Sequence, residues 1–182
     1  MKQKPFVFFC LFNLGAEKMK DELFDVVDEE DKVIGQASRT QCHENNLIHR
    51  SVMFFVFDSE KRVLITKRTQ NKDFFPGYFS IVLGGHVRSG ESYEEAASRE
   101  IEEELGIHTK PYLISFFNKR LPEEKENVKV FGVVAEEKIK LIEDELASGE
   151  FLTFDGLDKK IESEKFLPET ETLYSILFAH LS

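Results

Sequence analysis

Glutamate residues cluster on a short stretch of this 182-residue chain at a spacing that suits a metal ion. Glu100, Glu103 and Glu104 lie three and four residues apart. On a helix they would share one side, with Cβ atoms about 5 to 6 Å apart, and each like-charged pair would destabilise an isolated helix by ~0.2–0.5 kcal/mol. Two interpretations follow: a solvated acidic face, or a set of oxygen ligands for a cation such as Mg²⁺ or Mn²⁺.

Both ends of the helix that carries these glutamates are marked in the sequence. Ser92 and Glu95 have the spacing of a capping box, and Gly106 stands where a glycine cap ends a helix. An apolar ridge is expected to face the core, formed by Ala97, Ile101 and Leu105. The residues expected to face outward are Glu95, Ser98 and Glu102.

The turn that precedes the helix decides between the two interpretations. Gly84 and Gly85 supply backbone that can approach a ligand closely, just before the acidic helix. The glycines and glutamates belong to one string, which runs from Gly85 through Glu91 to Arg99-Glu100-Ile101-Glu102-Glu103-Glu104-Leu105-Gly106-Ile107. This combination favours a metal-assisted phosphate site.

The string resembles the signature of the Nudix hydrolase family, G-x5-E-x7-R-E-U-x-E-E-x-G-U, in which U is a bulky aliphatic residue. Every required position between Gly85 and Ile107 matches. The resemblance implies an α/β fold, a Nudix-type α/β/α sandwich with a mixed sheet. It also implies hydrolysis of a diphosphate linkage in a small nucleotide-like or other organic diphosphate by water attack on phosphorus, with Mg²⁺ or Mn²⁺ as cofactor.

The resemblance assigns roles to individual residues of the string. Glu100, Glu103 and Glu104 would bind the metal, with the carbonyl of Gly84 as a further ligand. Glu100 is the favoured general base, and Glu103 and Arg99 complete the catalytic group. Arg99 would orient a glutamate through a charge-assisted pair, and a plain surface ion pair is the alternative.

Four further residues are candidates for supporting or substrate-binding roles. Glu91 would anchor the loop or the metal shell, or else be an ordinary carboxylate at a helix N-terminus. His86 would contact metal or substrate, whereas a lone histidine is more often structural or solvated. Lys67 and Arg68 would contact phosphate, with a solvated basic pair as the alternative.

A rival function comes from resemblance to the Nudix branch close to type I isopentenyl diphosphate isomerase. The segment His43 to Arg50, the Gly85-His86 pair and the Phe-Pro-Gly-Tyr-Phe loop carry this resemblance. Histidines of the isomerase stand near positions that match His43, His49 and His86.

Two departures favour hydrolysis over isomerisation. Gly84 stands where the isomerase has its essential cysteine, and neither cysteine of the chain fills that place. The isomerase's glutamate pair on a later strand is expected to be absent, because Asn127-Val128-Lys129-Val130 occupies that region. A proton transfer that depends on cysteine cannot run without it. A catalytically silent ligand-binding module on the same fold is a third possibility.

Elements on both sides of the motif predict an α/β class. Strands or extended segments are expected at Leu23 to Asp28, Lys32 to Gln36, Ser51 to Phe57, Arg62 to Lys67, Tyr78 to Leu83, Ile107 to Asn118, Asn127 to Glu136 and Glu150 to Phe154. Two helices are expected near the end, Asp155 to Ser163 and Pro168 to Leu181. Ala37 to Asn46 is a polar stretch, and Asn71 to Tyr78 is a loop.

The length of the chain fits a single domain, and its acidic net charge argues against binding to nucleic acid. The net charge of -10 would repel a polyanion such as a nucleic-acid polymer, while a small diphosphate can still bind through a cation. Two cysteines fit a reducing cytoplasm, and no membrane span is expected. Residues 19–182 are expected to form one domain. Residues 1–18 are expected to be an extension, with a weak signal peptide or an upstream start codon as alternatives.

Overall fold

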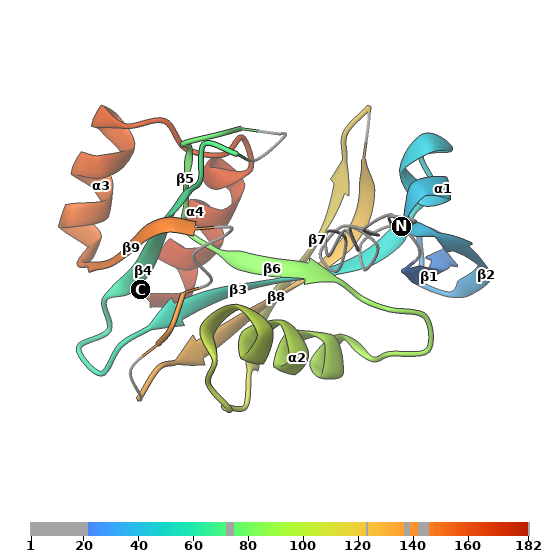
Figure 1. Ribbon diagram of the computed structural model, residues 1–182, viewed down its shortest axis with the longest axis horizontal. Helices are drawn as coiled ribbons and strands as arrows, with labels where there is room; N and C mark the ends of the chain where they lie inside the picture. Colours follow the sequence, from blue (N-terminus) through green and yellow to red (C-terminus); the bar gives the residue numbers. More distant parts are fainter. Residues whose placement is uncertain (1–21, 72–74, 123, 137–138, 142–145, 182) are drawn as a thin grey trace, which may run out of the picture.

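The structure is a computed structural model that describes residues 22–71, 75–122, 124–136, 139–141 and 146–181. The expected extension, residues 1–18, lies outside this part of the chain. The elements follow the order β1 (Leu23–Val27), β2 (Val33–Ser38), α1 (Arg39–Glu44), β3 (His49–Phe57), β4 (Val63–Arg68), β5 (Phe79–Ser80), β6 (Leu83–His86), α2 (Tyr93–Leu105), β7 (Tyr112–Arg120), β8 (Lys125–Val134), β9 (Leu146–Leu152), α3 (Phe154–Ser163) and α4 (Thr170–Leu181) (Figure 1).

Strand β3 is the centre of a mixed sheet. It pairs in parallel with β8 along its whole length, from His49 opposite Glu126 to Phe57 opposite Val134. It pairs antiparallel with β6 and touches β1 and β4 by antiparallel bridges. β7 extends the sheet beyond β8, β2 extends it beyond β1, and β5 and β9 flank β4. The first hairpin and the glycine-rich strand β6 therefore both reach the same central strand.

Apolar side chains on the two faces of β3 form separate cores. Val52, Phe54 and Val56 pack with α2 through its buried residues. Phe55 and Phe57 pack on the other face, with Leu157 of α3 and residues of α4. Figure 1 shows α2 on one side of β3 and β8, with α3 and α4 on the other. The alternation of side chains along a strand thus builds the expected α/β/α sandwich, which is confirmed.

Most expected elements are present with shifted ends, and two were missed. Gly84 and Gly85, expected in a turn, lie in strand β6, because they pair with Met53 and Val52 of β3. The polar stretch from Ala37 to Asn46 contains α1, which begins with a full capping box between Ser38 and Gln41. Strand β7 ends at Arg120 and strand β8 begins at Lys125, so the turn between these two strands is shorter than expected. β9 begins at Leu146 rather than at Glu150. None of the helices in the described part of the chain combines the length and apolar character that crossing a bilayer requires.

A carboxylate at the turn between β1 and β2 ties this hairpin to the centre of the sheet. Asp31 Oδ1 accepts hydrogen bonds from Arg50 Nε at 3.0 Å, the Tyr93 hydroxyl at 3.0 Å and Asn127 Nδ2 at 3.1 Å. Burial alone would raise the pKa of Asp31, but these hydrogen bonds and the charge of Arg50 lower it. Because Asp31 has a φ of 64°, asparagine is the replacement that tolerates its backbone best.

We expect Asp31→Asn to lower the free energy of unfolding at neutral pH by about 1 to 3 kcal/mol, because two neutral donors and a guanidinium lose their charged acceptor. A carboxylate whose pKa is lowered by folding contributes stability above its unfolded pKa, and this contribution disappears as the pH falls through the folded value. The difference between the two proteins should therefore shrink below about pH 4. Urea unfolding at neutral and acid pH measures it, with the exposed Glu30→Gln as control. An equal difference at both pH values would contradict the assignment.

Candidate active site

Helix α2 carries the glutamates, and its ends and buried face are as expected. Ser92 Oγ accepts from the Glu95 amide while Glu95 caps the Ser92 amide, so the capping box is complete. Gly106 ends the helix in the left-handed region with a φ of 66°. Three residues of the apolar ridge are fully buried, namely Ala97, Ile101 and Leu105. The helix is therefore held in a fixed orientation against the sheet.

Arg99 joins the loop before the helix to the glutamates on it. Its Nε and Nη2 donate to the two oxygens of Glu91 at 2.9 and 3.0 Å, a bidentate pair. Nη1 donates to Glu100 Oε1 at 2.6 Å, and Nη2 also donates to the carbonyl of His86 at 3.0 Å. The side chains of Arg99, Glu91 and Glu100 are only 17%, 16% and 14% exposed. This is a partly buried ion cluster, where charge-assisted hydrogen bonds are stronger than on an open surface.

The Glu91 carboxylate is held from two directions. Besides Arg99, the backbone amide of Arg88 donates to Glu91 Oε2 at 3.0 Å. Burial alone would raise the pKa of Glu91, but the hydrogen bonds from Arg99 and Arg88 lower it. Glu91 is therefore ionised and anchors the loop to the helix.

The Glu100 carboxylate packs directly against the backbone of β6 at Gly85. A Cβ atom added to Gly85 would come within 2.3 Å of the Glu100 carboxyl carbon and Oε1. Burial raises the pKa of Glu100 although Arg99 opposes this shift. A partly buried carboxylate whose pKa stays raised beside a guanidinium is the kind of group that a bound cation stabilises in its ionised form.

The other two glutamates flank Glu100 on the same side of α2. Glu103 is half exposed, and its carboxylate lies 3.5 Å from Arg99 Nη1 and 3.7 Å from Arg88 Nη2. Glu104 is partly buried. Hard oxygen donors arranged in this way suit Mg²⁺ or Mn²⁺, which accept a few carboxylates and complete their shells with water and phosphate oxygens. The residues present therefore fit the expected cofactor.

Gly84 lies on β6, whereas the basic residues Lys67 and Arg68 lie at the end of β4. Gly84 pairs with Met53 of β3, and a Cβ there would come within 2.1 Å of the Val52 carbonyl oxygen. Lys67 Nζ lies 4.9 Å from the centre of the Phe79 ring, in the core on the α3 and α4 face. The amide of Arg68 donates to the Tyr78 carbonyl, at the same end of β4. The structure thus places Gly84 on β6, next to the Gly85 position that the Glu100 carboxylate of α2 approaches, and it places Lys67 on the opposite face of the sheet from α2.

Three histidines, His43, His49 and His86, lie close together. The rings of His49 and His86 stack with centroids 5.1 Å apart, and His43 meets both edge-on at 5.2 and 5.5 Å. Phe24 of β1 stacks on His49 and His86. The ligating atoms of the three histidines all lie within 4.8 Å of one another. Nitrogen donors at this spacing suit a transition metal such as zinc.

A buried glutamate completes this histidine cluster and corrects an expectation. Glu126 Oε1 lies 3.3 Å from His86 Nε2 and 3.7 Å from His49 Nε2, and Glu124 joins it beside His86. Burial by itself would raise the pKa of Glu126, but His86, Lys119 and His49 lower it. The expectation that no glutamate pair occupies this region was therefore wrong. Glu126 lies in β8 and Glu124 just before it, so the pair precedes the expected strand start at Asn127.

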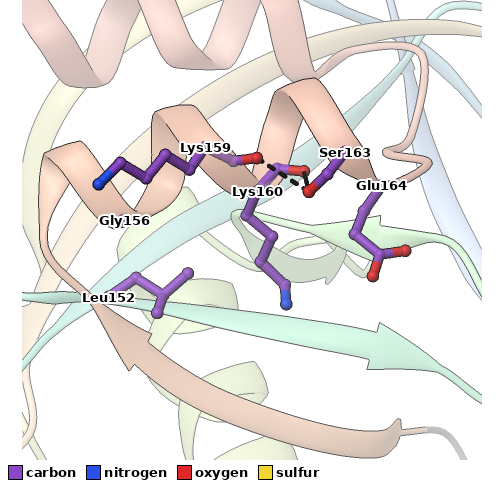
Figure 2. A pocket seen from close by; sticks show the side chains of 6 residues that line it. All are labelled: Leu152, Gly156, Lys159, Lys160, Ser163 and Glu164. Atoms are coloured by element: carbon purple, nitrogen blue, oxygen red, sulfur yellow. Dashed lines mark hydrogen bonds between the residues drawn. The ribbon is translucent and has the colours of Figure 1, made fainter.

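The hollow along α3 is not part of either cluster. It has a volume of about 250 Å³ and is lined by Leu152, Gly156, Lys159, Lys160, Ser163 and Glu164 (Figure 2). Lys160 Nζ binds Glu150 at 2.7 Å and lies 4.3 Å from the centre of the Phe79 ring. Because α3 covers the face of the sheet opposite α2, this hollow is remote from the glutamates.

Comparisons with known proteins agree on one family. Residues 47–170 match the NUDIX domain family. An uncharacterized Nudix hydrolase of Pseudomonas aeruginosa is 30% identical over 82% of this chain and 89% of its own. Another, of Streptomyces coelicolor, is 44% identical over 53% of this chain and 54% of its own. The crystal structure of DR0079 from Deinococcus radiodurans superposes with a TM-score of 0.70 at 28% identity, covering 84% of this chain and 96% of that one.

The sandwich, the Arg99 cluster and these matches identify the class of protein. The chain belongs to the Nudix family, and its named relatives are Nudix hydrolases. Its match spans about half the length of the Streptomyces and Yersinia pestis relatives.

We expect Gly85→Ala to weaken Mg²⁺ binding by about 10- to 100-fold, because the new methyl group displaces the Glu100 carboxylate. Gly35→Ala in β2 is the matched control, since a Cβ there meets nothing within 4 Å. Calorimetric titration of both variants with Mg²⁺, beside thermal melts that check folding, measures the effect. Unchanged Mg²⁺ affinity in folded Gly85→Ala would show that Glu100 does not hold the ion.

Proposed function

We propose that this protein is a metal-dependent hydrolase that cleaves the diphosphate linkage of a small nucleotide-like or other organic diphosphate by water attack on phosphorus. One observation carries the proposal: Arg99 and Gly85 hold the Glu100 carboxylate in a partly buried position, beside two further glutamates on the same side of α2. Membership of the Nudix family supports the reaction class.

Glu100, Glu103 and Glu104 would hold Mg²⁺ or Mn²⁺, with the carbonyl of Gly84 as a further donor. When bound, such an ion supplies positive charge for the diphosphate oxygens and lowers the pKa of bound water. The side chains of the protein do the remaining work. Glu100 is our candidate for the general base, because Arg99 and the close backbone at Gly85 fix its carboxylate beside the other two glutamates.

Arg99 and Glu91 are positioning residues in this proposal. The bidentate pair between them fixes the guanidinium, and the guanidinium fixes Glu100. Glu103, half exposed at the open side, can turn toward an incoming phosphate or metal. His86 contributes its carbonyl to Arg99 and its ring to the histidine cluster. Lys67 and Arg68 would take part only with a substrate long enough to reach past β4.

A small substrate and a cytoplasmic location complete the proposal. The net charge of -10 disfavours a nucleic-acid polymer and leaves a small diphosphate, bound through a cation, as the partner. The low cysteine content fits a reducing compartment, and Cys42 is buried as a free thiol.

The histidine cluster favours one alternative, an enzyme like isopentenyl diphosphate isomerase. His43, His49 and His86 lie at the positions where this resemblance places histidines of the isomerase, with ligating atoms within 4.8 Å of one another, and Glu126 lies 3.3 Å from His86. Against it stands Gly84, where the isomerase has its cysteine. Any side chain at this position would have to displace the β3 backbone, since a Cβ would lie 2.1 Å from the Val52 oxygen. A silent ligand-binding module is the third outcome that the test must separate.

Turnover of a substrate panel tests the proposal. We expect release of phosphate, pyrophosphate or monophosphate products from one class among nucleoside diphosphates, nucleoside triphosphates and prenyl diphosphates with Mg²⁺ or Mn²⁺. Glu104→Gln should reduce this turnover by about 100-fold, because it removes a negatively charged oxygen from the metal-binding set.

Glu102→Gln is the matched control, since Glu102 is exposed on the outward face of the same helix. Its turnover should equal that of the unchanged protein. Formation of an allylic isomer without phosphate release would support the isomerase alternative. Binding without any turnover would leave the ligand-binding module.

A further inference from the structure

The first hairpin contacts the loop that leads into α2, although it lies outside the matched family region. The match begins at residue 47, whereas β1 and β2 end at Val27 and Ser38. The Ser89 amide donates to the Leu23 carbonyl of β1 at 2.7 Å. The loop is therefore bound to β1.

Asp25 is the side chain of β1 that holds this loop. Its Oδ1 accepts from the Ser89 hydroxyl at 2.7 Å, and its Oδ2 accepts from the Gly90 amide at 3.0 Å. Gln36 Nε2 bridges the same groups, donating to Ser89 Oγ at 2.6 Å and to Asp25 Oδ1 at 3.3 Å. Asp25 is 9% exposed, so both of its oxygens are occupied by the loop and hairpin rather than by solvent.

The backbone of the loop has a conformation that needs such support. Gly90 has a φ of 79°, in the left-handed region that glycine adopts readily and also leaves readily. The next residue is Glu91, whose carboxylate binds Arg99 through both oxygens. A carboxylate that fixes the Gly90 amide thus fixes the direction in which Glu91 leaves the loop.

From Glu91 the contacts continue to the glutamate that the proposed function uses. Arg99 binds Glu91 on one side and Glu100 on the other, with distances of 2.9 and 2.6 Å. A parallel contact runs through Glu22, which binds Arg88 at 2.9 Å, and Arg88 in turn lies 3.7 Å from Glu103. Two acidic residues of the hairpin region therefore act on two of the glutamates of α2 through arginines and the loop.

We propose that Asp25 is a positioning residue of the hydrolytic site, which fixes the Ser89-Gly90 turn and thereby sets Glu91, Arg99 and the metal-binding carboxylate of Glu100. This inference rests on the proposed function of the glutamates. It makes the hairpin a working part of the active site. Residues that orient metal ligands from outside typically contribute about 10- to 100-fold to metal affinity or activity.

The test compares two aspartates of the same hairpin. Asp25 holds the loop, whereas Asp28 Oδ1 accepts from the Glu30 and Lys32 amides within the hairpin turn. Asp25→Ala and Asp28→Ala each remove one charge and loosen the hairpin, but only the first releases the loop. Binding of Mn²⁺ is followed by electron paramagnetic resonance, and the glutamate site is taken as the binding that Glu104→Gln abolishes.

We expect Asp25→Ala to weaken Mn²⁺ binding at this site by about 10- to 100-fold, with Asp28→Ala within about twofold of the unchanged protein. Asp25→Asn keeps one acceptor oxygen for Ser89 and should be intermediate. With a substrate from the turnover panel, Asp25→Ala should lower kcat and raise the metal concentration for half-maximal rate, while the substrate KM changes little. Amide exchange of Gly90 should accelerate in Asp25→Ala only.

Each remaining outcome has a definite meaning. A folded Asp25→Ala that binds Mn²⁺ like the unchanged protein overturns this inference alone. An equal loss in Asp28→Ala also overturns it, because the effect is then a general loosening of the hairpin. Mn²⁺ binding at the glutamates without hydrolysis of any diphosphate overturns the proposed function and leaves the role of Asp25 in metal binding standing. Absence of Mn²⁺ binding sensitive to Glu104→Gln overturns both.

Discussion

The partly buried guanidinium of Arg99 is the interaction on which the site depends. It binds both Glu91 and Glu100 and ties α2 to the carbonyl of His86 on β6. Breaking a buried ion pair by removal of one partner costs about 3 to 5 kcal/mol, because the other charge remains without compensation. The same cluster leaves Glu100 short of positive charge, as its raised pKa indicates. The chain thus maintains an acidic site that a divalent cation would stabilise.

Strand β6 runs between two sets of side chains that could hold different metal ions. Glu100 presses against Gly85 on the side of α2, while the ring of the next residue, His86, joins His43, His49 and Glu126. The side chains of successive residues of a strand point to opposite faces, so one strand serves both sets. The oxygen set suits Mg²⁺ and the nitrogen-rich set suits a transition metal. Because Gly84 has no side chain, β6 can approach the backbone of β3 closely at this position.

Local signals in the sequence predicted the helix and its ends, because the capping box, the glycine cap and the apolar ridge act within a few residues. The histidine cluster could not be completed in this way. Glu126 reaches His49 through the parallel pairing of β8 with β3, and periodicity does not determine which strands pair. Asp25 was missed for the same reason, since it acts on residues 64 and 65 positions later. A polar residue at a buried position of a predicted strand was the available signal.

The position of the bound ion tests the central claim most directly. Crystals equilibrated with Mn²⁺ would be measured by anomalous diffraction, which locates the metal without reference to activity. We expect a peak beside Glu100, Glu103 and Glu104, and its loss in Glu104→Gln. A peak confined to His43, His49, His86 and Glu126, with none beside α2, would contradict the assignment of the glutamates as the hydrolytic metal site.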